Sequence, residues 1–238
     1  MDEFLELVSD KDDAEGQFLL GNAYLNGDGV EQDFQRAFYW YKKSAEQDFS
    51  NAQCNLGFLY ENGIGTQKDY KEALYWYKKS AEQNNPMAQN NLASMYETGL
   101  GVEQDFQQAV YWCKKAAEQG NANSQCALGG YYFQGLGVEQ DYEKAFCLFN
   151  DSAKQGLALA QNNLATMYEK GLGVKQDFQQ AVYWYKKSAE QNNPMAQYNL
   201  GLLYKNILKD SQKAIYWFQK AAEQGDKDAE DMLIALNL

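Results

Sequence analysis

A segment of 36 residues recurs along the chain, and this period constrains the fold more than any other feature of the sequence. The copy from Tyr96 to Gln119 reads YETGLGVEQDFQQAVYWCKKAAEQ, and related segments begin at Tyr24, Tyr60, Tyr132 and Tyr168. A shortened sixth copy begins at Tyr204. Fixed periods of about 20 to 50 residues are typical of stacked arrays, in which each unit buries its apolar face against its neighbours. The sequence therefore predicts a repeat array.

Each copy is expected to form two helices. In the first, Leu56 and Tyr60 lie four residues apart, the spacing of an apolar helix face. In the second, Phe106, Ala109 and Trp112 follow each other at spacings of three, which also place residues on one helix face. A small residue recurs inside the first helix, which predicts a close approach by a neighbouring helix: Gly21, Gly57, Ala93, Gly129, Ala165 and Gly201.

The segments between these helices carry capping signals. Asn85-Pro86 and Asn193-Pro194 mark starts of first helices. An aspartate is expected to cap each second helix: Asp33, Asp69, Asp105, Asp141 and Asp177. A glycine follows each first helix, where a left-handed residue ends a helix: Gly27, Gly63, Gly99, Gly135 and Gly171. We predict an all-α fold with a cap over 1–13, repeats at about 14–49, 50–85, 86–121, 122–157, 158–193 and 194–226, and a capping helix over 227–238.

The charge of the chain limits its partners. With 21 basic and 33 acidic residues the net charge is −12, and no basic stripe is present. We therefore expect neither nucleic acid nor an anionic membrane surface as a partner. No run of about 18 apolar residues could span a bilayer. The acidic start MDEFLELVSDKDD lacks the basic and apolar regions of a secretory signal. We expect a cytoplasmic protein, with a secreted effector as the alternative.

Catalytic and metal-binding groups are scarce. The sequence has no histidine and no CxxC motif, so nucleophile–base pairs of the Ser-His or Cys-His kind are excluded. We expect no enzyme activity, no metal site and no cofactor. The four cysteines, which we interpret as reduced structural thiols, are Cys54, Cys113, Cys126 and Cys147. Cys113 and Cys126 flank one turn, and they are the one pair for which a disulfide is plausible.

The repeated pattern resembles the Sel-like repeat (SLR) family, relatives of the tetratricopeptide repeats. The matching residues of the second copy are Ala52, Leu56, Gly57, Tyr60, Gly63, Gly65, Asp69, Ala73, Trp76 and Ala81. The resemblance implies a right-handed superhelical solenoid whose first helices line a concave surface. It also implies a role in adaptors, signalling scaffolds, complex assembly or, in some bacterial pathogens, host-cell interaction.

One branch of that family, the Helicobacter cysteine-rich proteins, has paired cysteines that bridge successive repeats. Their places correspond here to Glu118 and Gln125, with Cys126 one residue away. The disulfide-stapled character and the β-lactam binding of that branch are therefore not expected of this chain.

Candidate partner-binding residues are those at which the copies differ. Three positions of the first helix share a face opposite the Leu56 and Tyr60 stripe. The first contributes Phe18, Cys54, Asn90, Asn162 and Tyr198. The second contributes Asn22, Phe58, Ser94, Thr166 and Leu202. The third contributes Glu61, Glu97, Phe133, Glu169 and Lys205. One interpretation is a solvated face that drifts freely; the other is a partner site, because displayed apolar groups often mark one.

The sequence thus favours a non-enzymatic scaffold or adaptor that binds a peptide or protein along the concave face of the first helices. The acidic residues at the third position suggest a basic partner. Two alternatives stay open. One is an immunity or antitoxin-like inhibitor of a partner enzyme, and the other is a secreted effector that acts on host proteins.

Overall fold

The computed structural model describes residues 13–236, and within that range every regular element is a helix. The all-α class predicted from the 36-residue period is therefore confirmed. The expected cap over 1–13 lies, except for Asp13, outside the described residues. The chain forms two compact units, Met1–Ser124 and Gln125–Leu238, each described by itself.

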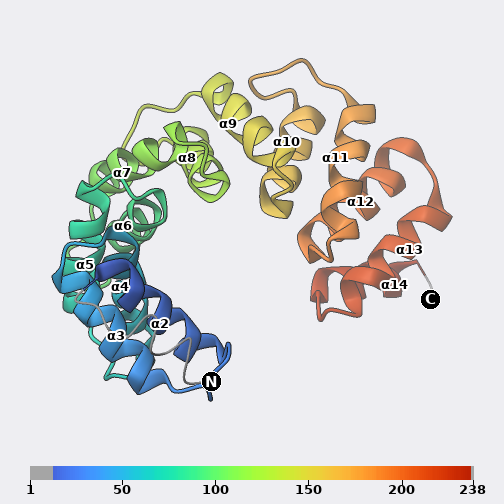
Figure 1. The fold of residues 1–238 in the computed structure, drawn as a ribbon. Coiled ribbons are helices and arrows are strands. Elements are labelled where there is room, and N and C mark those ends of the chain that lie inside the picture. The colour runs from blue at the N-terminus through green and yellow to red at the C-terminus, as the bar shows by residue number, and fades with distance from the viewer. Residues whose placement is uncertain (1–12, 237–238) are drawn as a thin grey trace. The chain divides into compact units, whose positions relative to one another are not determined.

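Unit 1 consists of antiparallel helix hairpins laid side by side (Figure 1). The first helices are α2 (Ala14–Asn26), α4 (Ser50–Asn62) and α6 (Pro86–Thr98). The second helices are α3 (Phe34–Glu46), α5 (Tyr70–Glu82) and α7 (Phe106–Glu118). The boundary with unit 2 falls inside α8 (Ala122–Gln134).

Unit 2 continues the alternation. Its further first helices are α10 (Ala158–Lys170) and α12 (Pro194–Leu203). Its second helices are α9 (Tyr142–Lys154), α11 (Phe178–Glu190) and α13 (Ser211–Ala222). In the sixth copy the glycine connector is replaced by the π-helix η1 (Tyr204–Leu208), and α14 (Lys227–Ala235) follows α13.

The helix ends follow the predicted capping signals. The Asp69 carboxylate accepts hydrogen bonds from the backbone N–H groups of Lys71 and Glu72, at 2.9 and 3.1 Å. The other four predicted aspartates also cap the second helices. Asn85 and Asn193 cap α6 and α12, with proline following. The five glycines predicted to follow first helices all have a positive φ, as at Gly63 (φ 70°), so the left-handed end is confirmed.

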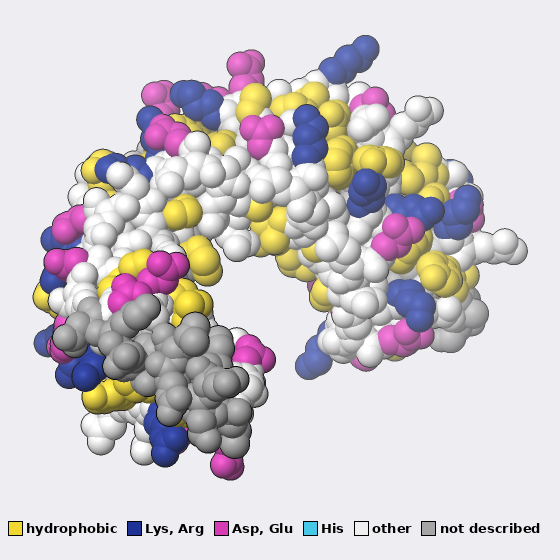
Figure 2. Space-filling model, in the orientation of Figure 1, with side chains coloured by type: hydrophobic (Ala, Val, Ile, Leu, Met, Phe, Trp, Pro, Cys, Tyr) yellow, Lys and Arg dark blue, Asp and Glu magenta, His cyan; other side chains and the backbone are white. Residues whose placement is uncertain are grey.

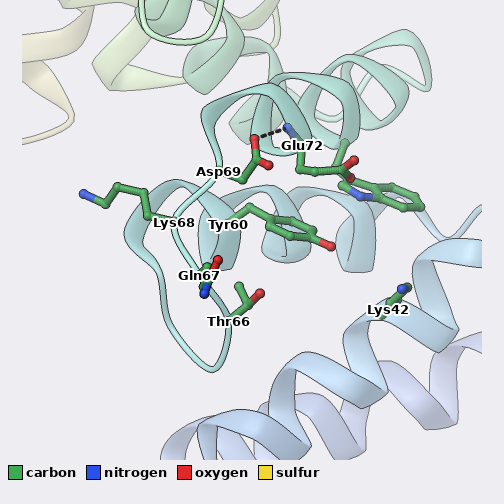
Figure 3. Close-up of a pocket in the computed structure, with 8 residues that line it drawn as sticks. Lys42, Tyr60, Thr66, Gln67, Lys68, Asp69 and Glu72 are labelled. Carbon is green, nitrogen blue, oxygen red and sulfur yellow. Dashed lines mark hydrogen bonds between the residues drawn. The ribbon is translucent and has the colours of Figure 1, made fainter.

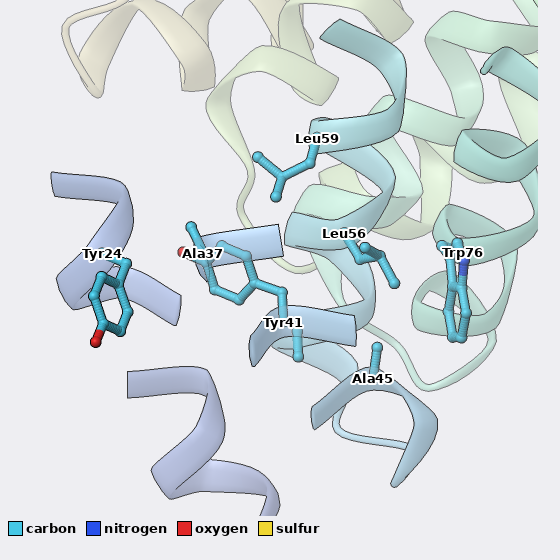
Figure 4. Packing of buried hydrophobic residues seen from close by; sticks show 8 residues of the cluster. Tyr24, Ala37, Tyr41, Ala45, Leu56, Leu59 and Trp76 are labelled. Carbon is cyan, nitrogen blue, oxygen red and sulfur yellow. The ribbon is translucent and has the colours of Figure 1, made fainter. Parts of the chain in front are cut away.

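In the copies that carry glycine at the small position of the first helix, a ring from the second helix lies against that glycine. A Cβ added at Gly57 would lie 2.7 Å from the ring of Tyr77, and one at Gly201 would lie 2.6 Å from Phe218. The predicted close approach is confirmed, and the approaching group is an aromatic side chain. Figure 4 shows the core of unit 1, in which Leu56 and the buried Trp76 pack with neighbouring residues of other helices.

A buried glutamine joins three helices at the junctions between repeats. The Gln53 amide Nε2 on α4 donates to the carbonyl oxygen of Ala45 in α3, at 3.2 Å. Its Oε1 accepts from Gln83 Nε2 at the end of α5, at 2.8 Å. Gln89, Gln161 and Gln197 repeat both bonds. These side chains satisfy carbonyls near the ends of second helices, which the helix itself leaves without a donor.

Candidate protein-interaction surface

The first of the three candidate positions lies mainly between helices. Cys54 is 4% exposed and Asn162 is 5% exposed, so the prediction that they face a partner is wrong. Burial raises the pKa of the Cys54 thiol to about 12, which keeps it protonated. Asn162 Oδ1 accepts from Asn199 Nδ2 of the next first helix, at 3.1 Å. This position therefore serves packing between repeats.

The remaining residues at that position are also engaged within their units. Asn90 Oδ1 accepts a hydrogen bond from Ser124 Oγ at 2.8 Å. The Phe18 ring lies 5.3 Å from that of Phe49, and the Tyr198 ring lies 5.8 Å from that of Phe218. All three are half-buried. The contacting residues lie in a first helix (Ser124), just before one (Phe49) and in a second helix (Phe218), so neighbours on several sides cover this position.

The second position carries the most exposed candidates. Phe58 on α4 is 45% exposed, and Ser94 on α6 is exposed as well. Asn22, Thr166 and Leu202 are half-buried. Phe58 is thus a large apolar side chain standing on a surface where the neighbouring copy carries serine.

At the third position, tyrosine hydroxyls from the second helices reach the candidate acids. Tyr77 donates to Glu61 Oε2 at 2.6 Å, and Tyr185 donates to Glu169 Oε2 at 2.7 Å. Burial, followed by the nearby carboxylate, raises the pKa of Tyr77, so its hydroxyl remains a donor. The carboxylates stay half-buried at the surface. They are therefore held in place, with further acceptor capacity on each carboxylate.

The other third-position residues differ from copy to copy. Glu97 is half-buried on α6, and in its copy Cys113 stands where Tyr77 and Tyr185 stand in theirs. Phe133 on α8 is half-buried, with its ring 5.3 Å from that of Tyr142. Lys205 lies in η1, and its Nζ is 3.9 Å from Met232 Sδ. Its placement on a first helix is wrong, because the sixth copy changes backbone geometry there.

We define the first-helix surface of each unit by the candidates that remain accessible. In unit 1 these are Asn22, Phe58, Glu61, Ser94 and Glu97. In unit 2 these are Phe133, Thr166, Glu169 and Leu202. Within each unit, the set combines apolar, hydroxyl and carboxylate groups.

The second helices carry exposed aromatic residues that sequence reasoning missed. Tyr75 is about half exposed, and its ring lies 5.0 Å from the buried Trp76. Lys79 Nζ lies 5.5 Å from the Tyr75 ring centroid and 5.7 Å from that of Trp76. The same arrangement recurs at Tyr39, Tyr111 and Tyr183. Each tyrosine precedes the tryptophan by one residue, which is about 100° around the helix. This offset from a core residue could have indicated that the tyrosine is exposed.

A polar cavity of about 440 Å³ lies in unit 1 beside the connector between α4 and α5 (Figure 3). Lys42 and Lys68 line it together with Asp69 and Glu72. Trp76 also lines it, and its buried indole Nε1 has no hydrogen-bond partner among the residues that the structure describes. The two cations offset the two carboxylates, so the lining has no net charge by which to select a ligand.

Charges of both signs are intermixed on the visible face of the protein (Figure 2). Within residues 13–236, no group of three or more His, Cys, Asp or Glu side chains is arranged to hold a metal ion. In the same range, no helix combines the length and the apolar character needed to cross a membrane.

The fold and these surfaces define a helical-repeat solenoid built of stacked helix hairpins. The family model described as Sel1 repeat matches residues 14–49, 50–85, 86–121, 122–157, 158–193 and 194–226. The chain therefore belongs to the Sel1 repeat family, whose members generally mediate protein–protein interaction.

Solved structures give the same result. A protective antigen of uropathogenic Escherichia coli with an SLR fold is 40% identical, with a TM-score of 0.85, over 94% of this chain and 48% of that one. The chain thus spans about half the length of that relative. A Sel1 repeat protein from Oxalobacter formigenes is 37% identical, with a TM-score of 0.80, over 88% of this chain and 85% of that one.

A more distant likeness concerns the fold alone. An immunity protein from Pseudomonas aeruginosa is 24% identical, with a TM-score of 0.54, over 90% of this chain and 83% of that one. Among curated proteins none matches the chain.

Proposed function

We propose that this protein is a non-enzymatic scaffold that binds a peptide or protein segment along the first-helix surface of its units. The exposed ring of Phe58 carries this proposal. An apolar ring on a surface otherwise lined by Asn22, Glu61 and Ser94 costs solubility and supplies no core packing. Aromatic side chains with a polar surround are typical anchors of protein interfaces.

The acids of unit 1 suggest the character of the partner. Tyr77 orients Glu61 at the surface, and Glu97 stands at the same position one repeat later. A partner segment that crosses both positions would gain from basic side chains. The net charge of −12 would assist its approach at low ionic strength.

A capture experiment with a matched aromatic control tests this proposal. Phe58→Ser introduces the residue that the third copy carries at Ser94, so it should leave the fold intact. Tyr75→Ser removes a similarly exposed ring from the second helix of the same repeat. We expect proteins captured from native lysate by the unaltered chain to be reduced at least tenfold by Phe58→Ser and little changed by Tyr75→Ser, as measured by quantitative mass spectrometry. Equal effects of the two substitutions, or none from Phe58→Ser, would reject the first-helix surface.

The inhibitor and effector roles would use the same kind of surface with a different partner. Capture of an enzyme whose activity falls on binding would support the inhibitor. Capture of a host protein would support the effector.

A further inference from the structure

Unit 2 contains a cavity of about 310 Å³ between α8 and α10. Phe133 on α8 and the buried Phe149 of α9 supply its apolar lining. Thr166 and Lys170 on α10 supply a hydroxyl and an ammonium group, and Gln134 and Asn163 complete the lining with amides.

The cavity exists because the fourth copy has a glycine at the second candidate position. Gly130 stands where the second copy carries Phe58 and the third carries Ser94. A Cβ added at Gly130 would meet no heavy atom within 4 Å among the described residues. The neighbouring Gly129 is different, because its added Cβ would lie 2.9 Å from the Phe149 ring. Gly129 therefore serves core packing, whereas Gly130 leaves space open above the same ring.

The lining favours an apolar group with a negative charge beside it. Thr166 Oγ1 already lies 2.9 Å from the Tyr185 hydroxyl, and Asn163 Nδ2 contacts Cys126 Sγ at 4.0 Å. Lys170 is the one charged residue in the lining, and it is exposed. Two phenyl rings thus offer an apolar site, and the one charge carried by the lining itself is positive.

We propose that this cavity is a socket for one aromatic or long aliphatic side chain of a partner polypeptide, whose adjacent carboxylate pairs with Lys170. The proposal rests on the scaffold function above and specifies which part of the partner unit 2 holds. An apolar residue at the C-terminus of a partner carries the apolar side chain and the carboxylate on the same Cα.

Two small probes separate the apolar and charged parts of this recognition. N-acetyl-L-phenylalanine carries the ring and the carboxylate, whereas N-acetyl-L-phenylalaninamide carries the ring without the charge. We expect both to shift the amide NMR signals of α8 and α10 in the full chain. Because the pair with Lys170 is solvent-exposed, the acid should bind about two- to fivefold more tightly than the amide.

Substitutions taken from the chain's own repeats provide the test of location. Gly130→Phe installs the residue present at Phe58 and should abolish the shifts from both probes. Gly130→Ala should leave binding within twofold, because a methyl group does not fill the space. Ser94→Phe places the same ring in unit 1 and should have no effect. Lys170→Gln should remove the preference for the acid and leave amide binding unchanged, which keeps the test decisive if Gly130→Phe does not fold.

The outcomes distinguish this proposal from the scaffold function. If neither probe shifts α8 and α10, or if a folded Gly130→Phe still binds them, the socket is wrong whatever Phe58→Ser does to capture. If Lys170→Gln keeps the preference for the acid, the charged part is wrong. If the probes bind as expected while Phe58→Ser leaves capture unchanged, the socket stands and the first-helix surface of unit 1 fails.

Discussion

The second glycine of the connector has a left-handed backbone, and in some copies it also lies against the preceding second helix. Gly65 has a φ of 68°, in the left-handed region that glycine enters without strain. An added Cβ would also overlap the carbonyl group of Phe34, at the start of the preceding second helix. Gly101 lies against the Tyr70 carbonyl in the same way, and an added Cβ would be 2.5 Å from the carbonyl oxygen. Gly29 has the same kind of φ (74°), but its added Cβ would meet nothing within 4 Å among the described residues.

This difference predicts unequal costs for one substitution at two equivalent positions. Gly29→Ala should lower the free energy of unfolding by about 1–2 kcal/mol, the cost of a left-handed alanine. Gly65→Ala should cost about 1–3 kcal/mol more, because the methyl group overlaps backbone that cannot rotate away. Urea denaturation of both variants measures the difference. Equal costs would show that the connector does not press on the preceding repeat.

At the scale of helices, buried Gln53 makes two hydrogen bonds to the preceding repeat and one within its own. Gln53 bonds to α3 through Ala45, to Asp48 after α3, and to Gln83 at the end of α5. Gln17 occupies the same place in the first copy and accepts one bond, from Gln47 at 2.9 Å. The same side chain therefore makes three hydrogen bonds at an internal junction and one in the first repeat.

The two glutamines allow the junction bonds to be measured. Gln53→Met keeps the side-chain volume and removes three bonds, so the free energy of unfolding should fall by about 2–3 kcal/mol. Gln17→Met removes one and should cost about 1 kcal/mol. Chemical denaturation with circular dichroism compares them. A cost for Gln17→Met as large as that for Gln53→Met would contradict the assignment of stability to the junction.

Sequence reasoning predicted the helices and their ends because those signals are local. The Asp69 cap and the left-handed Gly63 depend on a few adjacent residues, and both were found as expected. The candidate surface was predicted in part. Cys54 and Asn162 were misplaced because helical periodicity divides a helix into one core face and one outer face, whereas a stacked helix has neighbours on several sides. The cavity at Gly130 was not predictable, because its space depends on where Phe133 and Phe149 point.

At the scale of the whole molecule, helices α2–α7 and α9–α14 pack, each within its own unit, chiefly on the helices next to them in sequence. Stability in such an array is approximately a sum of repeat terms and nearest-neighbour terms. At the end of unit 2, Ala229 of α14 is buried against Phe218 of α13, and Met232 and Leu233 pack on the same cluster. Loss of the contacts between α14 and α13 should consequently destabilise only the neighbouring helices.

Deletion of residues 227–238 tests this locality. Hydrogen exchange should accelerate in α12 and α13, which lose the apolar cover of α14, and should be unchanged in α2–α7. Exchange measured by mass spectrometry on the intact and shortened chains gives both values in one experiment. Faster exchange throughout α2–α7 would mean that the array unfolds as one cooperative block.

The glutamine junction has a consequence for how the gene can change. Its bonds join one glutamine to another and to a main-chain carbonyl, which are groups that the internal copies share. Unequal crossing-over between two copies would therefore add or delete a whole repeat and recreate the same junction at the breakpoint. A protein engineer has the same freedom: a further copy spliced between residues 85 and 86 would find donors and acceptors already in register, and the array would lengthen without redesign of its joints.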